Sequence, residues 1–190
     1  MQRQEKGVLA AREILIAILK SMGEIWPDGS WVDSIAIGDA AYHEAVKRSD
    51  ITDRIVPFHK LSQWMSYSLI EPLQLAGIKI IHLDALTGLA EYRNGGLFID
   101  TGTISLRDET EMETLHDPKS PLIVEWRALT VTLLDQLAEQ IRRHTNTNAE
   151  SMPLVSILQG GTWSAGRRIA QRLRSDASPP LRLKSRGTIF

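Results

Sequence analysis

The stretch SPLIVEWRALTVTLLDQLAEQIRR, residues 120–143, is the strongest indication of fold class in the chain. Ser120 followed by Pro121 is typical of a helix N-cap with proline at the first helical position. Apolar residues then recur at helical spacing and form an expected buried stripe: Trp126, Leu129, Leu133, Leu134, Leu137 and Ile141. The pattern predicts a long amphipathic helix that ends near Arg142 and Arg143.

Three further segments have apolar residues at helical spacing: 7–22, 58–76 and about 151–173. In the second, Pro72 is expected to kink the helix or end its regular part, and Gly77 to cap it. In the third, Gly160 and Gly161 are expected to interrupt the helix, which restarts at Thr162. Four long helices with few strand signals predict a mainly α fold.

Connections and short extended segments are expected to make up the rest of one domain over residues 1–190. The first helix falls within 1–25. The other expected segments are a loop-rich stretch at 27–50, a short strand at 78–81, a tight turn at 94–96, a buried extended segment at 97–99, an exposed loop at 105–119 and an extended tail at 176–190.

Composition narrows the classes of function. The chain has 190 residues, with 22 Lys and Arg against 23 Asp and Glu, and lacks the basic excess of a general nucleic-acid binder. The absence of cysteine excludes disulfides, thiolate metal sites, Fe–S clusters and cysteine nucleophiles. The five histidines show no metal-ligand spacing, so no metal or other cofactor is expected.

The length of the apolar runs bears on where in the cell the protein is located. The most apolar run, residues 14–19, is too short to span a bilayer. We therefore expect a soluble cytoplasmic protein that contacts neither membrane nor nucleic acid and whose partner is a small molecule.

The first segment with chemical potential lies on the second predicted helix. Lys60, Gln63, Trp64 and Tyr67 occupy neighbouring helical positions and offer a cation, an amide and two rings. The same pattern is also typical of a half-buried face over which a lysine extends its aliphatic stem.

The second segment is LTGLAEYRNGG, residues 86–96. Glu91 stands two positions before Arg93, and a glycine turn follows at Asn94. In a cleft, Glu91 could activate a water or stabilise a cation while Arg93 binds an anion. The alternative is an ion pair that only holds a loop.

The third segment is the run Gly160, Gly161, Thr162 and Trp163, which is expected to open a helix rich in arginine. Free backbone N–H groups at a helix start suit phosphate. The Gly-Lys-Ser/Thr ending of a P-loop is missing, and a simple helix break explains the glycines equally well.

A further carboxylate, Glu125, precedes Arg127 early in the long helix. A carboxylate there is favoured by the helix dipole, and it is also a candidate second active-site acid.

Four strings together resemble the uracil catabolism protein 4 family, over roughly residues 26–190: VPFHKLSQWMSYSLIEP (56–72), LTGLAEYRNGG (86–96), VEWRALTVTLLD (124–135) and QGGTWSAGRRIA (159–170). Family members belong to a uracil degradation pathway that passes through ribosylated uracil and ribosylurea compounds. The resemblance therefore implies a role near cleavage of an N-glycosidic bond.

A more distant resemblance is to the queuosine salvage N-glycosylases. It rests on Phe58, Lys60 and Gln63, and on the later pattern Leu86-Thr87-x-x-x-Glu91-Tyr92-Arg93, in which those proteins carry aspartate in place of the glutamate. This resemblance implies a helical architecture like that of DNA glycosylases. It also implies catalysis by Glu91.

Together these resemblances imply an N-glycosidase-like hydrolase that acts on a ribosylurea-type compound or a pyrimidine nucleoside or nucleotide. Glu91 is the expected catalytic residue and Glu125 its candidate partner. The expected substrate contacts are Lys60, Gln63, Trp64, Tyr67, Arg93, Asn94, Arg127, Gly160, Gly161, Thr162 and Trp163.

The alternative is a non-catalytic binding or partner subunit. Family members are considerably longer, and this chain corresponds to their C-terminal half. We therefore expect either a partner chain that supplies the other half or a homo-oligomer.

Overall fold

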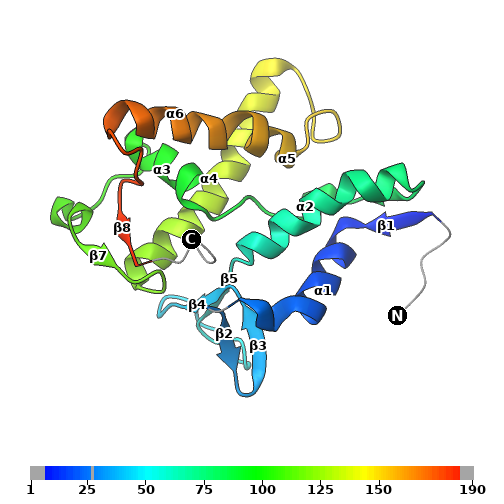
Figure 1. The fold of residues 1–190 in the computed structure, drawn as a ribbon, viewed down its shortest axis with the longest axis horizontal. Helices are drawn as coiled ribbons and strands as arrows, with labels where there is room; N and C mark the ends of the chain where they lie inside the picture. Colours follow the sequence, from blue (N-terminus) through cyan, green and yellow to red (C-terminus); the bar gives the residue numbers. More distant parts are fainter. Residues whose placement is uncertain (1–6, 27, 185–190) are drawn as a thin grey trace.

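A computed structural model describes residues 7–26 and 28–184, and in this part of the chain helices dominate (Figure 1). The predicted mainly α class is confirmed. No helix among these residues has the length and apolar character needed to cross a membrane. Residues 1–6 of the expected N-terminal segment 1–25 and residues 185–190 of the expected tail lie outside the described residues.

The α-helices are α1 (Ala11–Met22), α2 (Lys60–Leu75), α3 (Tyr92–Asp100), α4 (Pro121–Thr145), α5 (Leu154–Ile157) and α6 (Trp163–Leu173). Short 3₁₀ turns lie at η1 (Gly23–Ile25), η2 (Leu83–Ala85) and η3 (Glu109–Met112). A π-helical segment, η4 (Leu158–Thr162), joins α5 directly to α6.

The strands within the described residues pair only in twos. Two pairs are parallel: β1 (Val8–Ala10) with β6 (Lys79–Ile81), and β7 (Leu115–His116) with β8 (Arg182–Leu183). Two are antiparallel: β2 (Ser30–Val32) with β3 (Ile35–Gly38), and β4 (Ala40–Tyr42) with β5 (Ile55–Pro57). The strand predicted at 78–81 is β6. Because each pair of strands is small, the helices supply most of the hydrophobic core.

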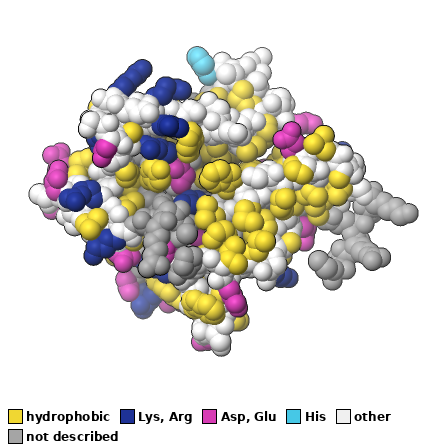
Figure 2. Space-filling model, in the orientation of Figure 1, with side chains coloured by type: hydrophobic (Ala, Val, Ile, Leu, Met, Phe, Trp, Pro, Cys, Tyr) yellow, Lys and Arg dark blue, Asp and Glu magenta, His cyan; other side chains and the backbone are white. Residues whose placement is uncertain are grey.

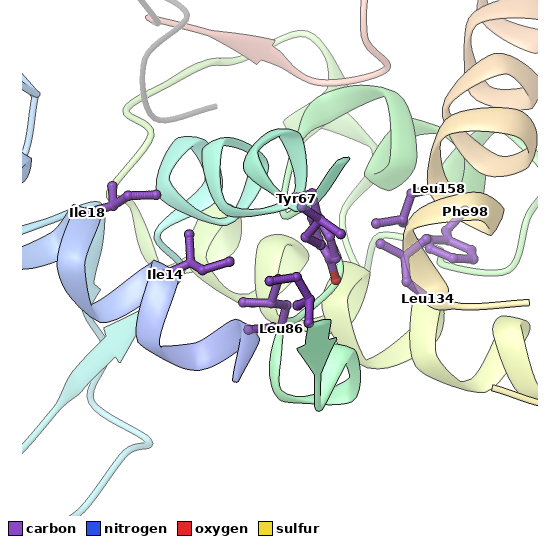
Figure 3. Packing of buried hydrophobic residues seen from close by; sticks show 10 residues of the cluster. Ile14, Ile18, Tyr67, Leu86, Phe98, Leu134 and Leu158 are labelled. Atoms are coloured by element: carbon purple, nitrogen blue, oxygen red, sulfur yellow. The ribbon is translucent and has the colours of Figure 1, made fainter. Parts of the chain in front are cut away.

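Helix α4 supplies residues to all three clusters of buried hydrophobic side chains. Leu134 joins the largest cluster, with Ile14 of α1 and Tyr67 of α2 (Figure 3). Val124 joins a second cluster around Phe58, and Trp126 a third. The prediction that residues 120–143 form a long amphipathic helix is therefore confirmed, although Leu129 in its expected buried stripe is exposed.

The end of α2 has the expected glycine cap. Gly77 has a positive φ of 84°, its N–H donates to the Gln74 carbonyl at 3.0 Å, and the N–H of Ile78 donates to Leu73 at 3.0 Å. This is the bonding of a Schellman motif. Pro72 does not end the helix: it lies in the last turn, where the missing N–H costs only one bond.

The tight turn predicted at 94–96 and the extended segment predicted at 97–99 are both wrong, because these residues lie in α3. The glycines serve packing instead. A Cβ on Gly95 would lie 2.8 Å from the Thr130 hydroxyl and 2.9 Å from the Trp126 ring. A sequence pattern cannot distinguish a glycine that turns the chain from one that admits a neighbouring side chain.

Two other expectations need correction. The stretch 27–50 contains strands β2, β3 and β4, which are too short to give a clear alternating pattern. Residues 8–10, expected to be helical, form β1. Their helical spacing is overridden by pairing with β6, whose residues are about 70 positions away.

The predicted helix break at Gly160 and Gly161 is also wrong. The chain passes from α5 through the π segment into α6 without leaving helical geometry. The N–H groups of α6 therefore do not form an open helix start. The phosphate site expected there loses its physical basis.

Candidate active site

A buried ion pair lies at the centre of the candidate site. The two terminal nitrogens of Arg127, Nη1 and Nη2, donate to the two carboxylate oxygens of Asp39, at 2.9 and 2.8 Å. Arg127 is fully buried, its Nε donates to the Ala90 carbonyl at 3.2 Å, and its guanidinium lies 4.0 Å from the centroid of the Phe58 ring. Such a bidentate ion pair fixes the orientation of both side chains.

Asp39 also positions the start of α2. Its carboxylate accepts the backbone N–H of Lys60 at 2.8 Å, and its carbonyl accepts those of Phe58 and His59 at 3.0 and 2.9 Å. His59, the residue before the helix, has a left-handed φ of 51°. These bonds hold the chain in a strained conformation that directs Lys60 into the interior.

Lys60 is buried and its pKa is lowered to about 8. Burial is the main cause, and the positive charge of Arg127 adds to it. The carboxylates of Asp39 and Glu91 act in the opposite direction. The lysine is therefore poised to exchange a proton close to neutral pH.

Glu91 is the N-cap of α3. Its carboxylate accepts the backbone N–H of Arg93 at 2.8 Å and that of Asn94 at 2.5 Å. Burial raises the pKa of Glu91, while these two N–H groups and the charge of Lys60 lower it. Glu91 is thus a buried acid whose pKa is influenced by the charge of a buried base, and such opposed shifts are typical of functional sites.

Gln63 and Tyr67 lie one and two turns further along α2 and bind the same loop. The Gln63 side-chain oxygen accepts the N–H of Thr87 at 3.3 Å, and the Tyr67 hydroxyl donates to the Thr87 carbonyl at 3.0 Å. This loop leads directly to Glu91. Both side chains therefore help to place the carboxylate relative to Lys60.

A cavity of about 320 Å³ adjoins this cluster. Phe58 connects the two, because its ring covers the Arg127 guanidinium and also lines the cavity, together with His59, Gln63 and Thr87. Val56, Ala128 and Val131 make the wall largely apolar. The cavity is of a size that accepts a small organic molecule.

Asn94 and Thr162 meet in the interior rather than in a phosphate site. The Thr162 hydroxyl donates to the Asn94 side-chain oxygen at 2.8 Å, and Asn94 is fully buried. This bond ties α3 to the π segment. Asn94 is also bonded to the Glu91 carboxylate through its backbone N–H, so this bond helps to fix the position of Glu91.

Other expected site residues lie elsewhere. Trp64 and Trp163 are exposed, as is Gly160, while Gly161 is half-buried. Glu125 is exposed and its carboxylate lies 3.2 Å from Nε2 of His43, so it does not share the buried environment of Glu91. The guanidinium of Arg93 donates to the Ala177 carbonyl at 2.7 Å.

Sequence reasoning missed Asp39. It stands in a stretch without periodicity, and its partner Arg127 is 88 positions away, so no local signal could have identified it. Among the described residues, no cluster of three or more histidine or acidic side chains is placed to hold a metal ion.

The buried lysine predicts a pH dependence of stability. The unfolded chain holds the Lys60 proton up to a pKa of 10.5 and the native protein releases it near 8, so stability should rise with pH between these values. Relative to Lys60→Met, the wild type should gain roughly 1–2 kcal/mol from pH 8 to 9.5. Urea denaturation measures this gain in stability. The pH range stays below the one in which Tyr67, whose pKa is raised by burial, lowers the stability of the native protein. An equal rise in both proteins would contradict the assignment.

Comparisons with known proteins agree with the first resemblance. A family model described as "Protein of unknown function (DUF1688)" matches residues 1–190. Protein urg3 of Schizosaccharomyces pombe is 43% identical over 169 residues, which cover 87% of this chain and 41% of that protein. Uracil catabolism protein 4 of Lachancea kluyveri is 35% identical over 207 residues, which cover 97% of this chain and 46% of that protein.

This chain thus spans less than half the length of each of these relatives. No solved structure matches. Neither the likeness to queuosine salvage N-glycosylases nor a DNA-glycosylase-like architecture finds support in these comparisons. The resemblance to uracil catabolism protein 4 is confirmed, and the chain belongs to the DUF1688 family.

Proposed function

We propose that this protein acts in uracil catabolism as an N-glycosidase-like hydrolase, on a ribosylurea-type compound or a pyrimidine nucleoside or nucleotide. One observation carries the proposal: Glu91 and Lys60 are buried together, and the pKa of each is shifted towards neutral pH. The names of the two relatives support the pathway. The buried pair supports the reaction class.

Hydrolysis of an N-glycoside breaks the bond between the anomeric carbon and nitrogen, while a water oxygen bonds to that carbon. Positive charge develops on the ribose as the bond breaks, and a fixed carboxylate stabilises it or takes a proton from the water. The leaving nitrogen receives a proton, giving urea or a pyrimidine base. We assign the role of this carboxylate to Glu91, whose raised pKa suits proton transfer.

Lys60 and Gln63 have supporting roles in this proposal. Lys60 sets the charge next to Glu91 and can bind a ribose hydroxyl or a phosphate oxygen. Gln63 lines the 320 Å³ cavity, where its amide can pair with the urea or pyrimidine part of the substrate. The apolar walls favour a planar group over a strongly hydrated one.

Replacing Glu91 by glutamine tests the assignment. The amide oxygen keeps one of the two backbone N–H bonds of the helix cap, and loss of the other is offset because the buried negative charge is removed. We expect release of urea or base from the candidate ribosides to fall at least about 100-fold, with the melting temperature nearly unchanged. The assay should include ribosylurea, uridine and uridine monophosphate.

A matched control is Asp108→Asn, which removes an exposed capping carboxylate at η3 and should leave the rate unchanged. Full activity in the Glu91 variant would remove this residue from the mechanism. Glu125→Gln decides whether a second carboxylate contributes, as in two-carboxylate glycosidases.

The cytoplasm is the proposed compartment. It rests on the short apolar run at residues 14–19 and is in keeping with the absence of cysteine. Fractionation of cells that express a tagged chain tests it.

A further inference from the structure

A second cavity, of about 390 Å³, lies between the two antiparallel strand pairs. Aliphatic side chains, including Val32, Ile37 and Ile55, make up most of its wall, and Arg48, Thr52 and His59 are its polar members. Two members of this wall are strongly exposed: Ile35 at 67% and Ile51 at 68%. We call this surface the β2–β5 groove.

The β2–β5 groove is poorly covered by its own chain. Two-stranded ribbons are marginally stable in water unless another element packs on them, and the β2–β3 hairpin projects from the rest of the molecule (Figure 1). Hydrophobic side chains also gather at this lower end in the space-filling view (Figure 2). An exposed apolar concavity of this kind is typical of a protein–protein contact.

The relatives indicate the occupant. More than half of Protein urg3 and of uracil catabolism protein 4 lies outside the part matched by this chain. We propose that the β2–β5 groove is the docking site for that remaining part of the longer relatives, or for its equivalent on a separate polypeptide.

Complementarity narrows the chemistry of the docking segment. It must present aliphatic side chains to Ile35 and Ile51. Arg48 also lines the groove, so an acidic side chain is expected opposite it. The groove shares His59 with the 320 Å³ cavity, but Lys60, Gln63 and Glu91 do not line it, so this inference does not rest on the hydrolase assignment.

The absence of cysteine allows a direct test. The variants Ile51→Cys and, as its match, Leu173→Cys in α6 report accessibility at two sites; Leu173 is 57% exposed. Each variant is co-expressed with the unmatched part of Protein urg3, and modification by a maleimide is timed. We expect at least about tenfold slower labelling at position 51 and no change at 173.

Equal labelling at position 51 with and without the added part overturns the proposal. Protection that already depends on the concentration of this chain alone also overturns it, because a second copy would then be the occupant. Ile35→Asp should abolish the protection while keeping the melting temperature.

A second measurement applies if the added part does not express. Hydrogen exchange in full-length Protein urg3 should be slower in the segment that aligns with residues 30–57 than in this chain, after correction for intrinsic rates. The segment that aligns with α6 is the control. Equal exchange in the 30–57 segment contradicts the docking site.

Discussion

Replacing Arg127 by methionine should lower the free energy of unfolding by about 3–5 kcal/mol, the largest loss of stability expected from a single side chain here. The variant would leave the Asp39 carboxylate buried without the two N–H donors that now bind it at 2.9 and 2.8 Å. An uncompensated buried charge is far more costly than the loss of one contact. Urea denaturation at pH 7 measures the effect.

A second change distinguishes loss of the pair from loss of volume. In Arg127→Met combined with Asp39→Asn, no buried charge is left unpaired, and the amide oxygen can still accept the N–H of Lys60. We therefore expect the double variant to be more stable than Arg127→Met alone. A single variant that loses less than about 1 kcal/mol would show that the pair contributes little.

Gly166→Ala should destabilise the protein by about 3 kcal/mol, at the upper end of the range for overpacked sites. Helices α3 and α6 pack closely, and a Cβ on Gly166 would lie well inside contact distance of the Arg93 carbonyl oxygen. Backbone cannot move aside as a flexible side chain can. The helices must separate, and the Asn94–Thr162 bond would be disturbed with them.

Gly160→Ala is the matched control for this glycine. It lies in the preceding π segment, and a Cβ there meets nothing within 4 Å. Alanine is favoured over glycine in helices, so this variant should be as stable as the wild type or up to about 1 kcal/mol more stable. Thermal and urea denaturation of both variants provide the comparison. A Gly166 variant of wild-type stability would contradict the packing argument.

The longer helices could be predicted because their apolar residues repeat locally, whereas α3 was not predicted. In α4, the stripe from Trp126 to Ile141 and the start at Pro121 indicated both type and boundary. The short strands could not be predicted, because three residues carry little periodicity and their partners lie far away, as with β1 and β6. The glycines of α3 led to a wrong prediction for a different reason. Gly95 is needed to admit Trp126 and Thr130, not to form a turn.

The candidate site was predicted only in part. Residue type and spacing indicated Lys60 and Gln63 on one helix and Glu91 before a glycine turn that proved to be helix α3, and the structure buries all three. Their surroundings depend on Asp39, which joins them only through the tertiary fold. Trp64 follows the buried Gln63 in the same helix but faces solvent, because consecutive residues of a helix point in different directions.

The π segment between α5 and α6 also bears on how the length of this chain can vary. A π turn holds one more residue than an α turn, so deleting Gly160 or Gly161 could be absorbed by a return to α-helical bonding. The phase of α6 would then be kept. The same deletion at Arg168 would rotate every later residue of α6 by about 100°. Shortened versions of this protein should therefore lose a glycine here before they lose any residue from the helix that follows.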